Sequence, residues 1–251
     1  MAILREATFS GVGVGVTATA ANAGFDNAQR DGTVVGVAGL SGGGQAIRKT
    51  GTGVDAFYWH FAARTSLYAR GYLKVDDAGT GNQTFAWVNK QAGVTSSRVT
   101  EVRFRSATRD FQIRNNLAAA QTTSATFALG DLIRWEWFVD RSAQTQTLRL
   151  FRTTNAEGAT PSETITGPTG AGDATFDRFG CLSQLVATGT PDVTLDKVAI
   201  GDAWIGPYSA VVTPAGAYQF IEWNGTTAAV LAPYEWDGSS TLTALEATEQ
   251  T

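Results

Sequence analysis

The stretch that decides the fold is LIRWEWFVD, residues Leu132–Asp140. Its apolar residues occupy every second position, and most of the positions between them carry charged side chains. Side chains along a β-strand point alternately to the two faces of a sheet, so a period of two predicts a strand with one face in a hydrophobic core. The residues expected on that buried face are Ile133, Trp135, Trp137 and Val139.

The same period extends outward from this segment in both directions. A polar connection at residues 140–145 leads to another alternating stretch at 147–150, as in a β-hairpin. Regularly spaced strands without intervening helical patterns predict an all-β sandwich or barrel. Turn-forming clusters separate further predicted strands. The clusters are 76–82, 106–110 and 160–173; the strands are 54–61, 69–75, 83–88, 102–105, 111–114, 176–182 and 193–200.

Two further segments have patterns that differ from the alternation of apolar and charged residues. Residues 11–16 alternate Gly with Val, which predicts a strand whose bare glycine face is approached closely by other backbone. The Ala-rich stretch 117–121 is flanked by Asn, Thr and Ser, and predicts one helical turn at most.

Composition and charge narrow the class of protein. Charged residues make up 17% of the chain, the net charge is −4 and the apolar fraction is 43%, which excludes a disordered chain. All 19 Lys and Arg residues lie at or before Lys197, whereas six Asp and Glu residues follow it. This acidic end argues against nucleic acid or an anionic membrane as its partner.

The chain divides near residue 208. All six prolines lie at or after Pro161, and the composition changes between Pro207 and Pro214. We therefore expect a main domain at 1–208 and an acidic extension at 209–251.

The extension contains a repeat, EWNGTT followed thirteen residues later by EWDGSS. Asn-Gly and Asp-Gly favour tight hairpin turns, so each copy predicts a small hairpin. Two such hairpins cannot bury a core of their own. We expect a docking arm on the main domain or on a neighbouring subunit, with partner contacts through Tyr218, Trp223, Tyr234 and Trp236.

Three segments resemble jelly-roll domains of the concanavalin A-like and laminin-G-like (LamG) kind. Residues 68–75 resemble an early sheet strand, and residues 133–151 resemble a hairpin with a Trp on its first strand. Residues 176–207 resemble the closing part, where an acidic pair precedes a WIGP-like ending, although Lys197 stands at the second acidic position. The resemblance covers residues 50–208 and implies a jelly-roll β-sandwich with a small C-terminal β-hairpin extension.

The Trp-Asn-Gly and Trp-Asp-Gly repeat resembles the tails of minor tail proteins from bacteriophages of actinobacteria. This resemblance implies a non-enzymatic structural protein of the tail or capsid surface that binds other virion proteins and adheres to host glycans. By analogy it also implies a homo-oligomer, namely a trimer. Residues Met1–Glu6 already contain charged side chains, so we expect no signal peptide. We expect instead a virion-surface location that is reached by cell lysis. No apolar run is long enough for membrane insertion.

Two alternatives to this virion role remain open. The first is a carbohydrate-binding, lectin-like module. The second is a glycoside hydrolase or lyase, which would need two carboxylates flanking the scissile bond. The strand pattern Glu-x-Asp-x-x-Glu does not occur, and we expect Glu136 to face solvent and pair with an Arg across the sheet.

The remaining catalytic signals also favour structural interpretations. His60 is the only histidine and is expected in a strand. Cys181 lies in an apolar context and is expected to be a buried small hydrophobe. The glycines of residues 39–44 lack the Gly-Lys-Ser/Thr ending of a phosphate loop, so we expect an ordinary loop there. No catalytic residue and no cofactor is therefore predicted.

The sequence contains three candidate binding sites. Sugar recognition needs exposed rings, and the candidates on predicted strands are Trp59, Tyr72, Trp87 and Trp137, with core packing as the alternative. Asp76 and Asp77 are candidate calcium ligands, with an ordinary turn as the alternative. A basic cluster provides another candidate surface for an anionic partner, with a solvated sheet face as the alternative. It comprises Arg98, Arg103, Arg105, Arg109 and Arg114.

Overall fold

The structure is a computed structural model of the 251-residue chain. It describes residues 3–30, 33–40, 44–51, 55–77, 79–90, 98–115, 120–152, 160–170, 174–182, 192–208, 221–223, 228–230, 234–236 and 242–244. The chain forms two compact units, Met1–Tyr208 and Ser209–Thr251.

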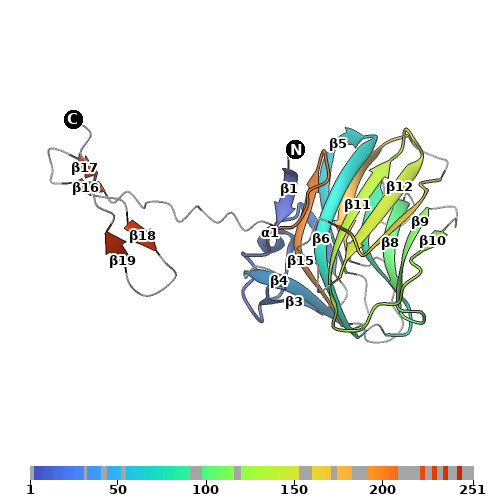
Figure 1. Ribbon diagram of the computed structural model, residues 1–251, viewed down its shortest axis with the longest axis horizontal. Coiled ribbons are helices and arrows are strands. Elements are labelled where there is room, and N and C mark those ends of the chain that lie inside the picture. The colour runs from blue at the N-terminus through green and yellow to red at the C-terminus, as the bar shows by residue number, and fades with distance from the viewer. Residues whose placement is uncertain are drawn as a thin grey trace. The chain divides into compact units, whose positions relative to one another are not determined.

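The first unit is a sandwich of two antiparallel sheets (Figure 1). Sheet A has the spatial order β13 (Glu163–Pro168), β12 (Thr145–Phe151), β11 (Leu132–Asp140), β6 (Ser66–Asp77), β15 (Asp192–Gly201), β4 (Gln45–Thr50) and β3 (Thr33–Ala38), and β1 (Ile3–Ala7) also pairs with β15. Sheet B has the order β10 (Ala120–Thr122), β9 (Asp110–Asn115), β8 (Arg98–Arg105), β7 (Asn82–Asn89), β14 (Phe176–Cys181), β5 (Asp55–Arg64) and β2 (Asn27–Arg30).

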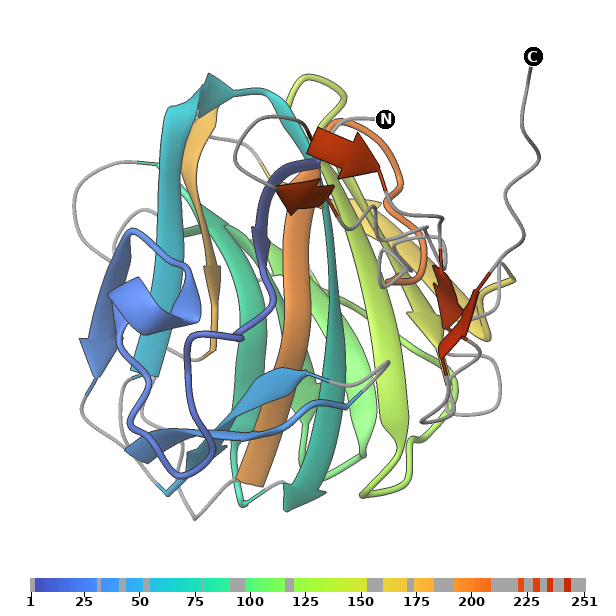
Figure 2. The same ribbon diagram turned by 90° about the vertical axis from the view of Figure 1, so that its left-hand side faces the viewer.

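Strands distant in sequence lie side by side in both sheets. In sheet A, β15 pairs with β6 along one edge and with β4 and β1, at different positions, along the other, as Figure 2 shows. In sheet B, β14 lies between β7 and β5. This arrangement is the predicted all-β jelly-roll sandwich of the concanavalin A kind.

The core lies between the sheets and contains the alternating apolar face that the sequence predicted. Trp135 on β11 is fully buried, and its ring lies over Gly71 of β6. A Cβ atom at Gly71 would come within 2.5 Å of the indole, which explains why this strand position holds a glycine. Phe85 of sheet B meets the same indole with ring centres 5.5 Å apart, joining the two sheets.

Strands β5–β9, β11, β12, β14 and β15 confirm the predicted strands. The predicted ranges, in the same order, were 54–61, 69–75, 83–88, 102–105, 111–114, 132–140, 147–150, 176–182 and 193–200. The strand predicted at 11–16 is wrong, since Val14 forms only an isolated bridge with Gly36. The close backbone approach expected there does occur, because a Cβ at Gly36 would lie 2.3 Å from the Gly13 carbonyl oxygen.

Other elements also differ from expectation. In the range 117–121, residues 117–119 lie outside the described residues, and residue 120 begins strand β10 instead of continuing a helical turn. The turn cluster 160–173 contains strand β13. The short helix α1 (Ala20–Ala23) was not predicted; Thr19 caps it by accepting a hydrogen bond from the Asn22 N–H.

The second unit contains two pairs of three-residue strands. β16 (Ile221–Trp223) pairs with β17 (Ala228–Val230), and β18 (Tyr234–Trp236) pairs with β19 (Leu242–Ala244). These are the two hairpins expected from the repeat, whereas their tips and Tyr218 lie outside the described residues. No helix in the described part of the chain is long and apolar enough to span a membrane.

Candidate functional site

The four rings proposed from sequence as sugar contacts are buried, and that proposal is corrected. Trp59 and Trp137 point between the sheets and are each 1% exposed. Trp87 lies over Gly180, and Tyr72 lies beneath the last residues of the first unit, where its hydroxyl accepts a hydrogen bond from the Tyr208 N–H at 2.8 Å. Since none of the four rings reaches solvent, none can stack on a sugar.

Three other rings are partly exposed on the outer face of sheet A. Tyr68 of β6 and Phe138 of β11 are cross-strand neighbours, and their rings stack with centres 4.4 Å apart. Trp204 follows β15 and meets Tyr68 edge-on, with ring centres 5.1 Å apart. We call Tyr68, Phe138 and Trp204 the aromatic platform.

A cation and two hydroxyls adjoin this platform. The Arg149 guanidinium carbon lies 3.7 Å from the centre of the Trp204 ring. No carboxylate of the described residues forms an ion pair with Arg149. On the next strands, the hydroxyls of Thr147 and Thr166 are 3.0 Å apart and exposed, and Thr147 is the cross-strand neighbour of Phe138. The platform therefore combines ring faces, a stacked cation and hydroxyl groups.

A closing segment, residues 202–208, positions Trp204 on the sheet. Gly206 has φ of 75°, a conformation that favours glycine, and its carbonyl oxygen accepts a hydrogen bond from Arg70 Nη1 at 3.4 Å. The Tyr208 ring lies 4.2 Å from Lys197 Nζ, a cation–π contact. These contacts hold the segment across the outer face of sheet A.

Glu136 lies on this same outer face but does not face solvent, contrary to expectation. It is 3% exposed, and its carboxylate is 3.2 Å from Arg134 Nε. Its cross-strand neighbours are Arg149 and Arg70, so arginines do lie across the sheet as predicted. Burial raises the pKa of Glu136, although the three arginines and a backbone hydrogen bond from Gly206 oppose the rise. A carboxyl held in this way cannot reach a glycosidic bond.

A shallow cleft opens at the other end of the same face. Its volume is about 220 Å³, and we call it the outer cleft. Its polar groups are paired, with Arg48 bound to Asp192 and Lys74 Nζ 2.8 Å from Asp76. It is lined by Val37, Ala38, Leu40, Arg48, Lys74, Asp76 and Thr194.

The two aspartates proposed as calcium ligands have protein partners. Asp76 pairs with Lys74, and Asp77 Oδ1 accepts a hydrogen bond from the Gly79 N–H at 2.8 Å. The second contact is a side-chain-stabilised turn, which was the alternative interpretation. Across the residues that the structure describes, no three His, Cys, Asp or Glu side chains gather to hold a metal ion.

The basic cluster on sheet B is not an open cationic surface. Arg105 binds Asp110 with its Nε 2.6 Å from Oδ1, and Arg103 pairs with Glu101, which is itself only 3% exposed. Burial and the nearby Arg114 charge lower the pKa of Arg103 to about 10. Arg109 lies in a turn with φ of 52°, and the side chain of Arg98 lies outside the described residues.

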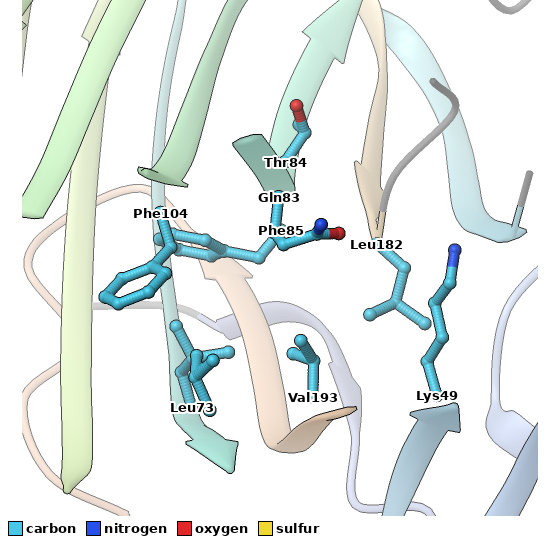
Figure 3. A pocket seen from close by; sticks show the side chains of 9 residues that line it. Lys49, Leu73, Gln83, Thr84, Phe85, Phe104, Leu182 and Val193 are labelled. Carbon is cyan, nitrogen blue, oxygen red and sulfur yellow. The ribbon is translucent and has the colours of Figure 1, made fainter. Parts of the chain in front are cut away.

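An enclosed cavity between the sheets is too small for a ligand (Figure 3). Its volume of about 10 Å³ suits about one water molecule. The buried Lys49 and Gln83 side chains project toward it, and Lys49 Nζ is 3.1 Å from Asp55. The cavity is therefore a feature of the core.

The two residues considered for catalysis are also placed. Cys181 is fully buried and burial raises its pKa, so its thiol is the small hydrophobe that was expected. His60 lies in strand β5, as expected, and its backbone N–H donates to Asp26.

Comparisons with known proteins were made on sequence and on structure. No protein-family model and no curated sequence matches the chain. Among solved structures, Trypanosoma rangeli sialidase with the inhibitor DANA is similar over 69% of this chain and 27% of that chain, with 10% identity and a TM-score of 0.48. Peanut lectin is similar over 70% of this chain and 92% of its own (13% identity, TM-score 0.43), and lectin II from Ulex europaeus over 69% and 90% (12% identity, TM-score 0.41). The chain spans about a quarter of the length of the sialidase; the jelly-roll assignment rests on the strand order.

None of the three platform residues was predicted from the sequence as a sugar contact. Phe138 carried a signal, since it is an apolar residue at a position where its strand otherwise presents charged side chains. Tyr68 and Trp204 become its neighbours only through the pairing of β6 with β11 and the path of the closing segment.

Proposed function

We propose that the protein is a non-catalytic glycan-binding module and that the aromatic platform is its binding surface. The observation that carries the proposal is the partly exposed group of contacting rings on the outer face of sheet A, in which Tyr68 stacks on Phe138 and Trp204 meets Tyr68 edge-on. Sugar rings present C–H faces that pack on aromatic rings, while their hydroxyls bond to polar groups at the rim. Thr147 and Thr166 are placed to supply such rim contacts.

The proposed ligand is an acidic glycan. Arg149 lies over the Trp204 ring, and its cross-strand neighbour Glu136, whose charge interacts with it, is ion-paired with Arg134. No carboxylate of the described residues forms an ion pair with Arg149 itself, so its guanidinium N–H groups can donate to a carboxylate or sulfate of the ligand. The stacking contact fixes the cation before the ligand arrives, which reduces the entropy lost on binding.

The absence of catalysis is part of the proposal. Asp140 and Glu136 each lie two residues from Phe138 on the same face of β11. Asp140 accepts hydrogen bonds from the Ser142 hydroxyl and the Ala143 N–H, whereas Glu136 is covered and ion-paired with Arg134. A hydrolase would need this group exposed beside a second carboxyl. Incubation with the bound glycan should therefore release no reducing ends.

The proposal is tested by binding to a panel of acidic polysaccharides and their neutral counterparts. We expect an acidic member to bind the wild-type chain and to bind Trp204→Ala at least about tenfold more weakly, a loss of about 1.4 kcal/mol. Val16→Ala, which removes an exposed apolar group away from the platform, is the matched control. No binding anywhere in the panel would refute the proposal.

A second candidate role is attachment to a larger assembly, such as a virion surface, through the C-terminal unit. It is favoured by the two hairpins of three-residue strands, which are too small to bury a core alone. This role is compatible with glycan binding and includes a homo-oligomer, the trimer being the specific expectation. Sedimentation of the full chain as a monomer at micromolar concentration would contradict it.

A further inference from the structure

The outer cleft is separate from the aromatic platform, although both lie on the outer face of sheet A. Tyr68 and Asp76 are on strand β6, an even number of residues apart, so their side chains share a face. Eight residues of extended strand place them about 26 Å apart. The closing segment crosses between them, over Arg70 and Tyr72. A ligand bound in the cleft therefore does not touch the platform.

The polar walls of the cleft are fixed in the unbound protein. Arg48 Nε donates to Asp192 Oδ1 at 2.6 Å, and a second guanidinium nitrogen bonds the other carboxylate oxygen. The pKa of Arg48 is raised, first by this hydrogen bond and also by the charge of Asp76, which places Asp76 close to the guanidinium. Leu40 is held by its N–H, which donates at 2.8 Å to the fully buried Asp196. The groups that would meet a ligand are thus oriented before it binds.

The charges around the cleft balance. Arg48 and Lys74 are cations, Asp76 and Asp192 are anions, and each cation is bonded to one of the anions. An anionic ligand would meet the two carboxylates, and a cationic ligand would meet the two basic groups. A neutral molecule is repelled by neither pair of charges. If it carries neighbouring hydroxyls it can also bond to both, because a hydroxyl both donates and accepts hydrogen bonds.

The apolar part of the lining consists of Val37, Ala38 and Leu40. Such a surface suits the C–H face of a sugar or cyclic polyol, and the largely buried Thr194 adds a hydroxyl-bearing side chain to the lining. The volume of about 220 Å³ is below the range of about 300–1,000 Å³ that holds drug-sized ligands. It therefore limits the occupant to one ring.

We propose that the outer cleft is a second binding site, for a neutral polyhydroxylated molecule of the size of one sugar ring. Arg48 and Lys74 donate to its hydroxyls, Asp76 accepts from them, and Leu40 packs on the C–H face. The acidic-glycan platform and this cleft differ in ligand charge, so the two sites are separable by experiment.

The test is a chemical-shift titration of the full ¹⁵N-labelled chain with the neutral methyl glycosides of glucose, galactose and mannose. Methyl glucuronide is the charged control. We expect one neutral glycoside to bind with a Kd of about 1 mM. Thr194→Val and, as a second variant, Asp76→Asn should each weaken that binding at least about fivefold. Thr122→Val, which removes an exposed hydroxyl on strand β10 of sheet B, away from both sites, should leave it unchanged.

Trp204→Ala separates the two proposals, because it should weaken acidic-glycan binding at least about tenfold and leave the neutral glycoside bound in the cleft. The cleft proposal is overturned if no neutral glycoside binds, if methyl glucuronide shifts the amide signals of the cleft residues at a lower concentration than methyl glucoside in the Trp204→Ala chain, or if both cleft variants bind as the wild type does.

Discussion

The guanidinium of Arg149 lies over the indole of Trp204, with its carbon 3.7 Å from the ring centre. This contact joins strand β12 to the closing segment, which is far from it in sequence. It also presents the planar N–H donors of Arg149 beside the partly exposed rings of Tyr68 and Phe138. The charge preference proposed for the platform depends on this pair.

Replacing Arg149 should change which glycans bind. Arg149→Gln removes the charge that bonds an acidic group, so we expect the acidic member of a matched pair to lose about tenfold in affinity and the neutral member to change little. Arg149→Lys should keep part of the preference, with a steeper salt dependence, because an ammonium acts as a point charge. Calorimetry at two salt concentrations measures both. Equal losses for the acidic and neutral glycans would contradict the charge preference.

Gly180 should not tolerate a side chain. A Cβ at this position would lie 2.0 Å from Cζ2 of Trp87, and the indole is fully buried and bonded through Nε1 to the Leu182 carbonyl. We expect Gly180→Ala to lower the free energy of unfolding by about 1–3 kcal/mol or more, measured by urea denaturation. The double variant Gly180→Ala with Trp87→Leu should lose less than the sum of the single losses, since the smaller ring leaves room. Strict additivity would show that the two residues do not collide.

Glu136 should give a pH dependence of stability with a defined sign. Because burial raises its pKa above the ordinary 4.5, the folded carboxyl holds its proton more tightly than the unfolded one. The free energy of unfolding therefore falls as the pH rises from about 4.5 through the folded pKa. In Glu136→Gln this slope should disappear, whatever the change in absolute stability. Urea denaturation at several pH values measures it.

Asp140 provides a control of opposite sign. Hydrogen bonds from the Ser142 side chain and from the Ala143 N–H lower its pKa below the ordinary 3.8. Its contribution to stability is therefore present above pH 3.8 and is lost as the pH falls through the folded pKa. Asp140→Asn should remove only this acidic slope. If Asp140→Asn instead altered the slope above pH 4.5, the assignment to Glu136 would be wrong.

Cys181 should be inert while the protein is folded. Its thiol is fully buried and its pKa is raised well above 9.0, so almost no reactive thiolate exists at neutral pH. We expect no reaction with a thiol reagent in buffer and a stoichiometric reaction in denaturant. Rapid labelling of the folded chain at a rate independent of denaturant would contradict this placement.

The fold was predictable from the sequence because period-two alternation and turn residues are local signals. Residues 132–140 show this, since their core-facing residues follow directly from the alternation. In 193–200 a bulge at Lys197 shifts the alternation, so that Val198 and Ile200 face the core after Val193 and Leu195. Burial of charge was not predictable in the same way. Glu136 occupies a position on the outer face and is removed from solvent where the closing segment, through the Gly206 backbone, bonds to its carboxylate.

Only the type of side chain in the candidate site was predictable from the sequence, and not which residues form it. The sequence indicated that aromatic rings would matter, but the large rings at alternating core positions, such as Trp137, were bound to be packed between the sheets. The platform depends on pairings between β6, β11 and β12 and on the path of residues 202–208. These are long-range relationships that a period in the sequence does not encode.

The central claim is that the aromatic platform binds glycan. Its most direct test is a calorimetric titration of an acidic oligosaccharide selected from the panel into wild-type, Phe138→Ala and Trp204→Ala chains, all shown to be folded by circular dichroism. We expect saturable binding by the wild type and a loss of at least about tenfold in each variant. Wild-type affinity in both variants would contradict the account.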